Sequence, residues 1–235
     1  MTTFIILLEK TMKKHGKKYR ESAKAVDSTK VYPLTEAVAL LKKVGYTKFD
    51  GSVEITVKTN ADAKYNDQMM RATTILPHGT GKSKRIAVFT ADETEAKKAW
   101  ADIAGTENLI ADIKAGKFDF DVLLTTPEHI RDLASVAKQL GPKGLMPSPK
   151  AGTVVANIPQ AVEEFKKGKM EFKIDKTGNV NAAVGRISFT EVQIEENIKA
   201  FLKALEDNKP TGVKGKLIKK IYIAPTMGPG IQIEC

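Results

Sequence analysis

The sequence predicts a two-domain protein, in which an α/β unit is inserted into an α+β domain that both ends of the chain build together. Residues 52–58 alternate between apolar and polar side chains, as a strand with one solvent-facing side does. Residues 86–89 and 122–124 are uninterrupted apolar runs between helical segments, which indicates a parallel sheet covered on both faces. After Gly168 the alternation returns, so the simplest architecture pairs the strands of the two chain ends.

Before the insertion, three elements are expected. Apolar residues recur at helical spacing from Leu34, and Gly45 stops the run, which predicts a helix over residues 34–44. The alternating residues 52–58 predict a half-buried strand. Residues 60–71 are polar and poorly patterned, so we expect a loop that contains a short helix.

The middle of the chain is expected to form a three-layer α/β unit from strands at residues 86–89 and 122–124. Capping residues and glycines predict three helices: from Asp92 through Ala104, from Thr106 to Gly116, and from Thr126 to Leu140.

The last part of the chain is expected to add strands and one long helix. Residues 170–174 and 180–184 alternate around a turn at residues 175–179, which predicts a hairpin. Thr190 is placed to cap a helix that extends to Leu205. Two further strands, residues 217–224 and 230–233, flank a bend rich in proline and glycine.

Charge and composition restrict the class of partner. The 235 residues are 42% hydrophobic and 28% charged, which is typical of a folded protein. The 38 Lys and Arg against 28 Asp and Glu leave a net charge of +10. That surplus favours a polyanion, nucleic acid before an anionic membrane, although a merely basic soluble protein fits the charge equally well.

Cysteine and histidine are too scarce for a disulfide or a metal cluster. The one cysteine is Cys235, and the three histidines are far apart, so we expect a reducing cytoplasm and no metal or other cofactor. The apolar run at residues 4–8 is too short to span a bilayer. Residues 1–11 are interpreted as a dispensable extension, with Met12 as an alternative start; a short membrane-touching anchor is the alternative interpretation.

Two motifs suggest enzymatic chemistry and fail on inspection. Residues 79–83 (GTGKS) lack the first glycine of a phosphate loop, because Leu76 occupies that position, and they lead into a strand rather than a helix. Asp119 and Asp121 precede a buried strand, where carboxylates are usually solvated. No histidine or serine stands at the spacing of a nucleophile and its base, so we expect no enzyme.

Two loops remain open between a structural and a functional interpretation. Residues 141–152 hold three prolines, three glycines and the cations Lys143 and Lys150, so they form either a rigid connector or a preset surface for phosphates. In residues 224–230, Gly228 and Gly230 permit close approach of a backbone, as RNA recognition requires, but an ordinary turn explains the segment as well.

Taken together, these loops and other segments in the same order resemble the signature segments of the ribosomal L1 family, specifically its bacterial members. The similarity extends from about Met12 to about Gln232. It is carried by residues 13–20 (KKHGKKYR), 48–50 (KFD), 67–68 (DQ), 76–81 (LPHGTG), 119–121 (DFD), 141–152, 175–178 (DKTG), 209–210 (KP) and 224–230.

This resemblance implies a discontinuous first domain, residues 12–78 plus 168–235, with a Rossmann-like domain inserted at residues 79–167. It implies a monomeric, cytoplasmic protein of the large ribosomal subunit that binds 23S rRNA in a mobile stalk. Further implied partners are the tRNA leaving the exit site and the protein's own messenger, whose translation it would repress. A nucleotide- or sugar-phosphate-binding enzyme, and a basic regulator that never joins the ribosome, are the alternatives.

The resemblance also assigns an RNA site to the first domain. Phe49 takes the place of the family's RNA-facing aromatic residue, Ser52 and Glu54 adjoin it, and a Thr-Met-Gly motif closes the contact. The complete expected site is Phe49, Ser52, Glu54, Lys58, Lys173, Asp175, Lys220, Thr226, Met227 and Gly228. We expect the Thr226 hydroxyl to contact ribose or base edges, and Gly228→Val to weaken binding while leaving the fold intact.

This chain departs from the family's usual pattern at four places. They are Asn60-Ala61-Asp62 in place of Gly-Ile-Asp, Ala72 in place of glycine, Ser148 in place of asparagine, and Ala224-Pro225 in place of hydroxyl residues. The preference between messenger and ribosomal RNA therefore stays open.

Overall fold

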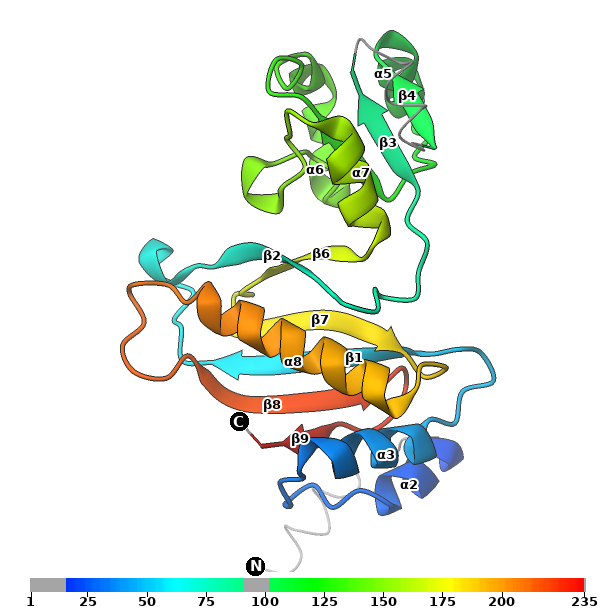
Figure 1. Ribbon diagram of the computed structural model, residues 1–235, viewed down its shortest axis with the longest axis vertical. Coiled ribbons are helices and arrows are strands. Elements are labelled where there is room, and N and C mark those ends of the chain that lie inside the picture. Colours follow the sequence, from blue (N-terminus) through cyan, green and yellow to red (C-terminus); the bar gives the residue numbers. More distant parts are fainter. Residues whose placement is uncertain (1–15, 91–101, 235) are drawn as a thin grey trace, which may run out of the picture.

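The computed structural model describes residues 16–90 and 102–234, and within them both chain ends contribute to one antiparallel sheet (Figure 1). Its order is β7-β1-β8-β9. The strands are β1 (Ser52–Thr59), β7 (Asn179–Arg186), β8 (Ile218–Pro225) and β9 (Ile231–Ile233). Because β1 lies between β7 and β8, the predicted pairing of the two ends is confirmed. The expected extension, the possible start at Met12 and Cys235 lie outside the described residues.

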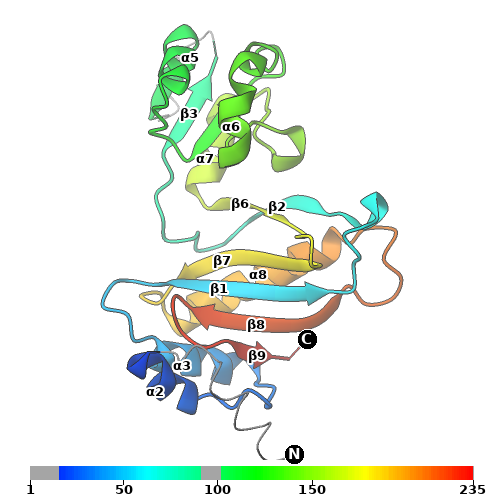
Figure 2. The same ribbon diagram turned by 180° about the vertical axis from the view of Figure 1, so that it is seen from behind.

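Helices cover one face of this sheet. The helices α3 (Leu34–Val44) and α8 (Glu191–Asp207) share a core with the buried side chains of β1, which are Val53, Ile55 and Val57. The short helix α2 (Lys17–Lys24) lies beside α3 and buries no side chain (Figure 1). Among the described elements, no helix lies over the opposite face of the strands, which is turned toward the viewer in Figure 2.

Capping residues fix the start of the long helix α8 at the position that the sequence predicts. The Thr190 hydroxyl accepts a hydrogen bond from the backbone N–H of Gln193, and the Gln193 side chain accepts one from the backbone N–H of Thr190. This reciprocal cap satisfies N–H groups that a helix start leaves without partners. The buried face of α8 includes Phe201, whose ring meets Phe172 edge-on at 5.3 Å between centroids.

The inserted segment forms a parallel sheet of order β4-β3-β5, with helices on both faces. Its strands are β3 (Ile86–Phe89), β4 (Ile103–Gly105) and β5 (Val122–Thr125). One face packs on α5 (Glu107–Lys114), on the 3-10 turn η2 (Asp132–Val136) and on α6 (Ala137–Lys143). The other face packs on α7 (Ile158–Lys166). Alternate side chains of β3 point to opposite faces of the sheet. Because helices cover both faces, the sequence of β3 is apolar throughout.

A two-stranded sheet lies between these two sheets in both ribbon views, and the sequence did not predict it. It consists of β2 (Arg71–Ile75), which lacks an alternating apolar pattern, and β6 (Lys169–Lys173). Both strands of the predicted hairpin and its turn form, but the pairing expected between the strands is wrong. The backbone of β6 pairs with β2, while β7 pairs with β1, and only Ile174 and Val180 form a bridge across the expected turn.

Two predicted helices of the insertion also need correction. Most of the helix expected from Asp92 lies outside the described residues, and its end is wrong because Ile103 and Ala104 pair with β3 as part of β4. The helix expected from Thr126 is wrong at both ends. Turns follow Thr126 before η2 and α6, and the helix continues to Lys143, where Gly144 with φ 71° ends it.

Two glycines touch where the linker from β2 to β3 passes the linker from α7 to β6. Gly79 and Gly168 have φ of 65° and 109°, and a Cβ on Gly168 would lie 2.5 Å from the Cα of Gly79. Only glycine permits this approach. Asn197 of α8, which is fully buried, holds the first linker: it accepts from the His78 N–H at 3.1 Å and donates to the carbonyls of Gly79 and Val184.

Candidate nucleic-acid interface

The uncovered face of the four-stranded sheet carries polar side chains in rows across the strands. Glu54, Thr56 and Lys58 alternate with the buried residues of β1, so they lie on the uncovered face. Their partners across the register are Ala183 and Ala224, Asn181 and Tyr222, and Asn179 and Lys220, respectively. The Thr56 hydroxyl donates to the Asn181 side-chain oxygen at 2.9 Å, and the Tyr222 hydroxyl donates to Gln232 at 3.2 Å.

Lys58 and Lys220 form an unusual pair on this face. They are direct cross-strand partners, both are exposed, and neither makes an ion pair with the described part of the chain. Like charges placed directly opposite each other destabilise a sheet. An anion that lies between the two ammonium groups would remove this repulsion, so the pair favours a polyanionic partner.

The bend after β8 presents Met227 to solvent at one end of the sheet. The Gly228 N–H donates to the Pro225 carbonyl at 2.9 Å, which closes a four-residue turn. Met227 is the one non-glycine residue of the described chain with positive φ, 65°, and it is 70% exposed. A left-handed backbone is costly for a side chain such as methionine, so the bend holds this residue under strain.

The loop before β1 lies against this bend. The Thr226 hydroxyl accepts from the Ser52 N–H at 2.8 Å and donates to the Ser52 carbonyl, and the Tyr46 hydroxyl donates to the Met227 carbonyl at 2.6 Å. Phe49, on the same loop, is 61% exposed. Thr226 therefore fixes the bend to β1, and the ribose contact expected of it stays a prediction. Phe49 and Met227 remain as the apolar surface.

The expectation for Gly228→Val is corrected by this geometry. A Cβ on Gly228 would lie 2.5 Å from Cγ of Pro225, within the same turn. Because a proline ring cannot move aside, the substitution would distort the bend itself, and a loss of binding would not isolate close approach by RNA.

At the far end of the sheet, Asp175 organises the turn between β6 and β7. Its carboxylate accepts from the N–H groups of Thr177 and Asn179, at 2.8 and 2.9 Å, and from the Thr177 hydroxyl. Partial burial alone would raise the pKa of Asp175, but these hydrogen bonds outweigh it and hold the pKa below its ordinary value of 3.8. Asp175 is thus committed to the turn, whereas Lys173 beside it is exposed.

The lowered pKa of Asp175 predicts a pH-dependent contribution to stability. A carboxyl whose pKa is lower in the folded state stabilises it above the unfolded pKa, and that stabilisation is lost as pH falls through the folded value. Asp175→Asn should therefore unfold more easily than the parent at pH 6, by less than about 1 kcal/mol because the group is partly solvated. Urea titrations should show the difference narrowing below pH 3.8. A constant difference from pH 6 to about pH 3 would contradict this.

Sequence reasoning missed several residues of this surface. Thr56, Asn181 and Tyr222 complete the middle row, and Tyr46 holds the Met227 carbonyl. The period-two pattern of β1 could have identified Thr56, which lies between Glu54 and Lys58. No local signal marks the others, because their positions depend on pairing between distant segments.

The two motifs that could have suggested an enzyme occupy ordinary positions in the fold. Residues 79–83 lead into β3 with no helix, and the Asp121 carboxylate accepts from the Arg85 N–H at 3.0 Å. Over residues 16–90 and 102–234, no group of three or more His, Cys, Asp or Glu side chains could hold a metal ion. No helix in these ranges is long and apolar enough to cross a membrane.

An uncovered sheet face with unpaired lysines, bounded by an exposed aromatic residue and methionine, is typical of nucleic-acid-binding proteins. Residues 41–229 match the ribosomal protein L1p/L10e family, so the chain belongs to that family. It is 51% identical over 226 residues to the large ribosomal subunit protein uL1 of Thermosipho melanesiensis, which covers 95% of this chain and 97% of that protein. The corresponding proteins of Thermosipho africanus and Fervidobacterium nodosum are 49% and 50% identical, with 95% of this chain covered in both cases and 97% and 96% of the relatives. Membership in a family of ribosomal proteins supports the expectation of a non-enzymatic protein.

Proposed function

We propose that this chain is a structural protein of the large ribosomal subunit that binds 23S rRNA through the uncovered face of its four-stranded sheet. The observation that carries the proposal is the exposed pair Lys58 and Lys220, whose mutual repulsion a phosphate backbone would relieve. Lys58 and Lys220 would hold phosphates, while Phe49 and Met227 would cover bases or riboses. Relatives about 50% identical are named as large-subunit proteins, which supports this assignment.

The finer parts of the proposal concern domains and further partners. We place a Rossmann-like domain at residues 79–167, inserted into an RNA-binding domain of residues 12–78 and 168–235. A protein of the cytoplasmic ribosome with this construction would act in the stalk and assist release of deacylated tRNA from the exit site. The same sheet face would bind any RNA of matching shape, including a site on the protein's own messenger, which would repress translation.

Fractionation on a sucrose gradient tests the proposal directly. In moderate salt the protein should sediment with large subunits. In binding assays, it should prefer a transcript of the 23S stalk helices to an arbitrary structured RNA of equal length. The affinity should fall with salt, with a log–log slope of roughly −0.7 to −0.9 per phosphate contact. A protein found only in the soluble fractions, with equal affinity for both RNAs, would overturn the assignment.

A further inference from the structure

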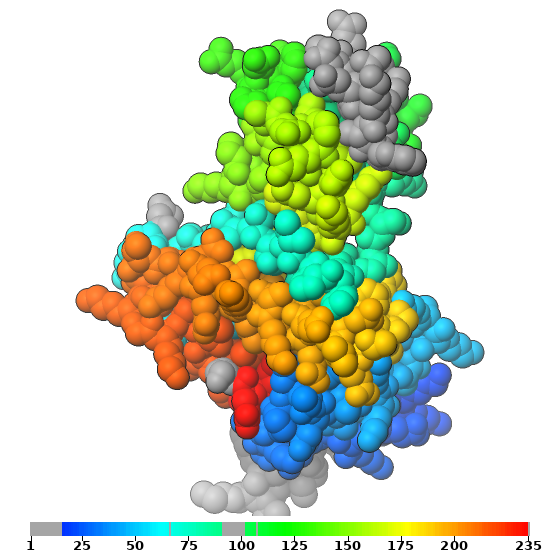
Figure 3. Space-filling view, viewed as in Figure 1, coloured from blue at the N-terminus to red at the C-terminus, as the bar shows by residue number. Residues whose placement is uncertain are grey.

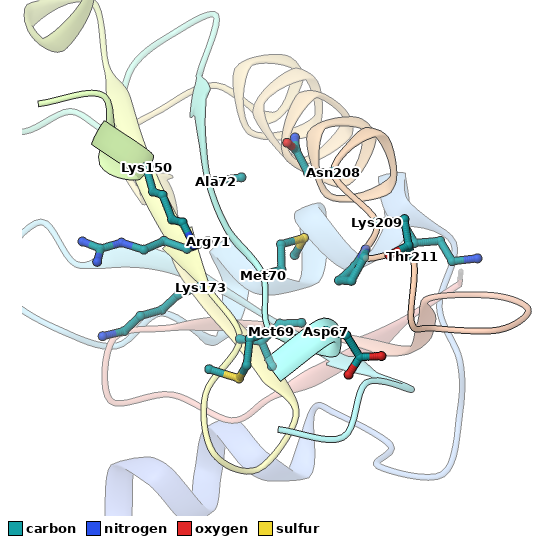
Figure 4. Close-up of a pocket in the computed structure, with 12 residues that line it drawn as sticks. Asp67, Met69, Met70, Arg71, Ala72, Lys150, Lys173, Asn208, Lys209 and Thr211 are labelled. Carbon is teal, nitrogen blue, oxygen red and sulfur yellow. The ribbon is translucent and has the colours of Figure 1, made fainter. Parts of the chain in front are cut away.

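A second basic surface lies in a groove that is lined by residues of both chain ends and of the inserted segment (Figure 4). The groove has a volume of about 870 Å³. Its charged lining residues are Asp67, Arg71, Lys150, Lys173 and Lys209. Four cations against one carboxylate give this groove an excess of positive charge, and Lys150 is the one cation that comes from the inserted segment.

The cations of the groove differ in how far they are already engaged. Arg71 pairs with Glu171 on the neighbouring strand, and Lys209 donates to the Gly215 carbonyl at 2.6 Å. Lys150 and Lys173 are exposed, and their ammonium groups make no hydrogen bond or ion pair with the described residues. The acid of the groove, Asp67, lies against the backbone of Gly212. The ammonium groups of Lys150 and Lys173 are therefore available to a ligand, because few acidic groups of the protein compete for them.

The backbone holds Lys150 firmly in place. It lies in η3 (Pro149–Ala151), one short turn of 3-10 helix, which Gly152 ends with φ 61°. The Thr153 hydroxyl accepts from the Ser148 N–H at 2.8 Å, and Ala151 is buried. The other lysine of this loop, Lys143, has its ammonium 3.4 Å from the centroid of the Phe118 ring. The two lysines of this loop thus have different roles: Lys143 packs within the inserted unit, and Lys150 faces the groove.

The floor of the groove is apolar, and one of the segments that line it runs on to the sheet face proposed to bind rRNA. Met69, Met70, Ala72 and Ile174 line it, and Met69 is 45% exposed. Lys173 leads through Ile174 into the Asp175 turn, and the next strand pairs Asn179 with Lys58. A strand of RNA crossing the sheet face could therefore continue into the groove. Riboses would then contact the methionines, and phosphates would contact the lysines.

We infer that this groove is a second RNA-binding site, which takes the sugar-phosphate backbone of a strand that also lies on the sheet face and ties it to the inserted segment through Lys150. The inference rests on the proposed function. A groove this large and open suits several linked nucleotides better than one inorganic anion, which would fill only a small part of it. Lys150 and Lys173 hold phosphates along one side of the groove, across from Lys209 (Figure 4), and Met69 supports a ribose or base.

Binding of a 23S stalk transcript to the full-length protein tests the site. Lys150→Ala should weaken binding roughly two- to fivefold, as loss of one exposed ionic contact does. It should also make the salt slope shallower by roughly 0.7–0.9. Lys150→Arg keeps the charge, so its affinity and its salt slope should equal those of the parent protein. Lys114→Ala, on α5 of the same inserted segment, removes an equal charge away from the groove and should change neither.

A localised cleavage experiment gives an independent readout. With Cys235→Ser as background, Lys150→Cys carries a tethered iron chelate that cleaves nearby RNA backbone, and Lys114→Cys is the matched control. Cleavage of the bound transcript from position 150 and not from position 114 supports the site. A parent protein that binds the transcript tightly, with no cleavage from position 150 and no effect of Lys150→Ala, overturns the groove alone. A parent protein that does not bind the transcript overturns the proposed function instead. If a short polyphosphate competed for the groove and the transcript did not, the groove would be a site for small anions, and the RNA assignment would be refuted.

Discussion

Lys58→Glu is expected to weaken binding to the 23S stalk transcript roughly tenfold or more, while making the free protein slightly more stable. The substitution removes a phosphate contact and places a negative charge beside the RNA backbone. In the free protein it converts the repulsive pair with Lys220 into an opposite-charge cross-strand pair. Such a pair stabilises a sheet by roughly 0.2–1 kcal/mol. A residue that lowers the stability of the free protein but raises its affinity for a ligand contributes to binding rather than to folding.

Filter binding over a range of salt, together with urea unfolding, measures both effects. Lys58→Gln should show an intermediate loss of affinity, because it removes the cation without adding an anion. Lys114→Glu changes the net charge of the protein as much as Lys58→Glu does, at a position on the inserted segment. An equal loss of affinity in Lys58→Glu and Lys114→Glu would mean that only the overall charge matters, and the sheet face would lose its assignment.

Asn197→Leu is expected to lower the free energy of unfolding by about 2–4 kcal/mol, the second large effect. Leucine fills a similar volume, but the Val184 carbonyl loses its partner in a buried position, and the His78 N–H and the Gly79 carbonyl lose theirs in partly buried positions. Buried polar groups without hydrogen bonds carry their full desolvation penalty. The first linker should also loosen from α8.

Urea denaturation monitored by circular dichroism gives the free energy of unfolding. The matched control is Asn208→Ala at the exposed end of the same helix, where one hydrogen bond to the Ala204 carbonyl is lost and water can replace it. We expect a change below about 1 kcal/mol for this control. Equal stability of Asn197→Leu and the parent would show that the linker backbone finds other partners.

Patterns within single segments predicted much of the fold. The alternation of residues 52–58 and the capping signal at Thr190 each specify their element through neighbouring residues, and both elements form where expected. β2 could not be predicted in this way, because its sequence RATTI is extended only through pairing with β6. The same pairing removes β6 from the hairpin that its own alternation suggested.

The candidate site was predictable to a similar extent. The sequence identifies which residues of β1 are polar, and a family resemblance draws attention to Phe49 and Met227. It cannot show that Lys58 and Lys220 face each other, because that depends on a register between strands far apart in the chain. For the same reason, the Thr226 hydroxyl could be assigned to a ligand from sequence, whereas its partner in the structure is the Ser52 backbone, 174 positions away.

The position of β1 between β7 and β8 has a consequence for synthesis of the protein. An emerging nascent chain carries β1 early, but its two neighbours leave the ribosome only after the whole insertion has been translated. The parallel sheet and its helices, with partners close in sequence, are free to fold first. The surface that pairs Lys58 with Lys220, through which we propose that the protein binds RNA, therefore forms only when translation is almost finished.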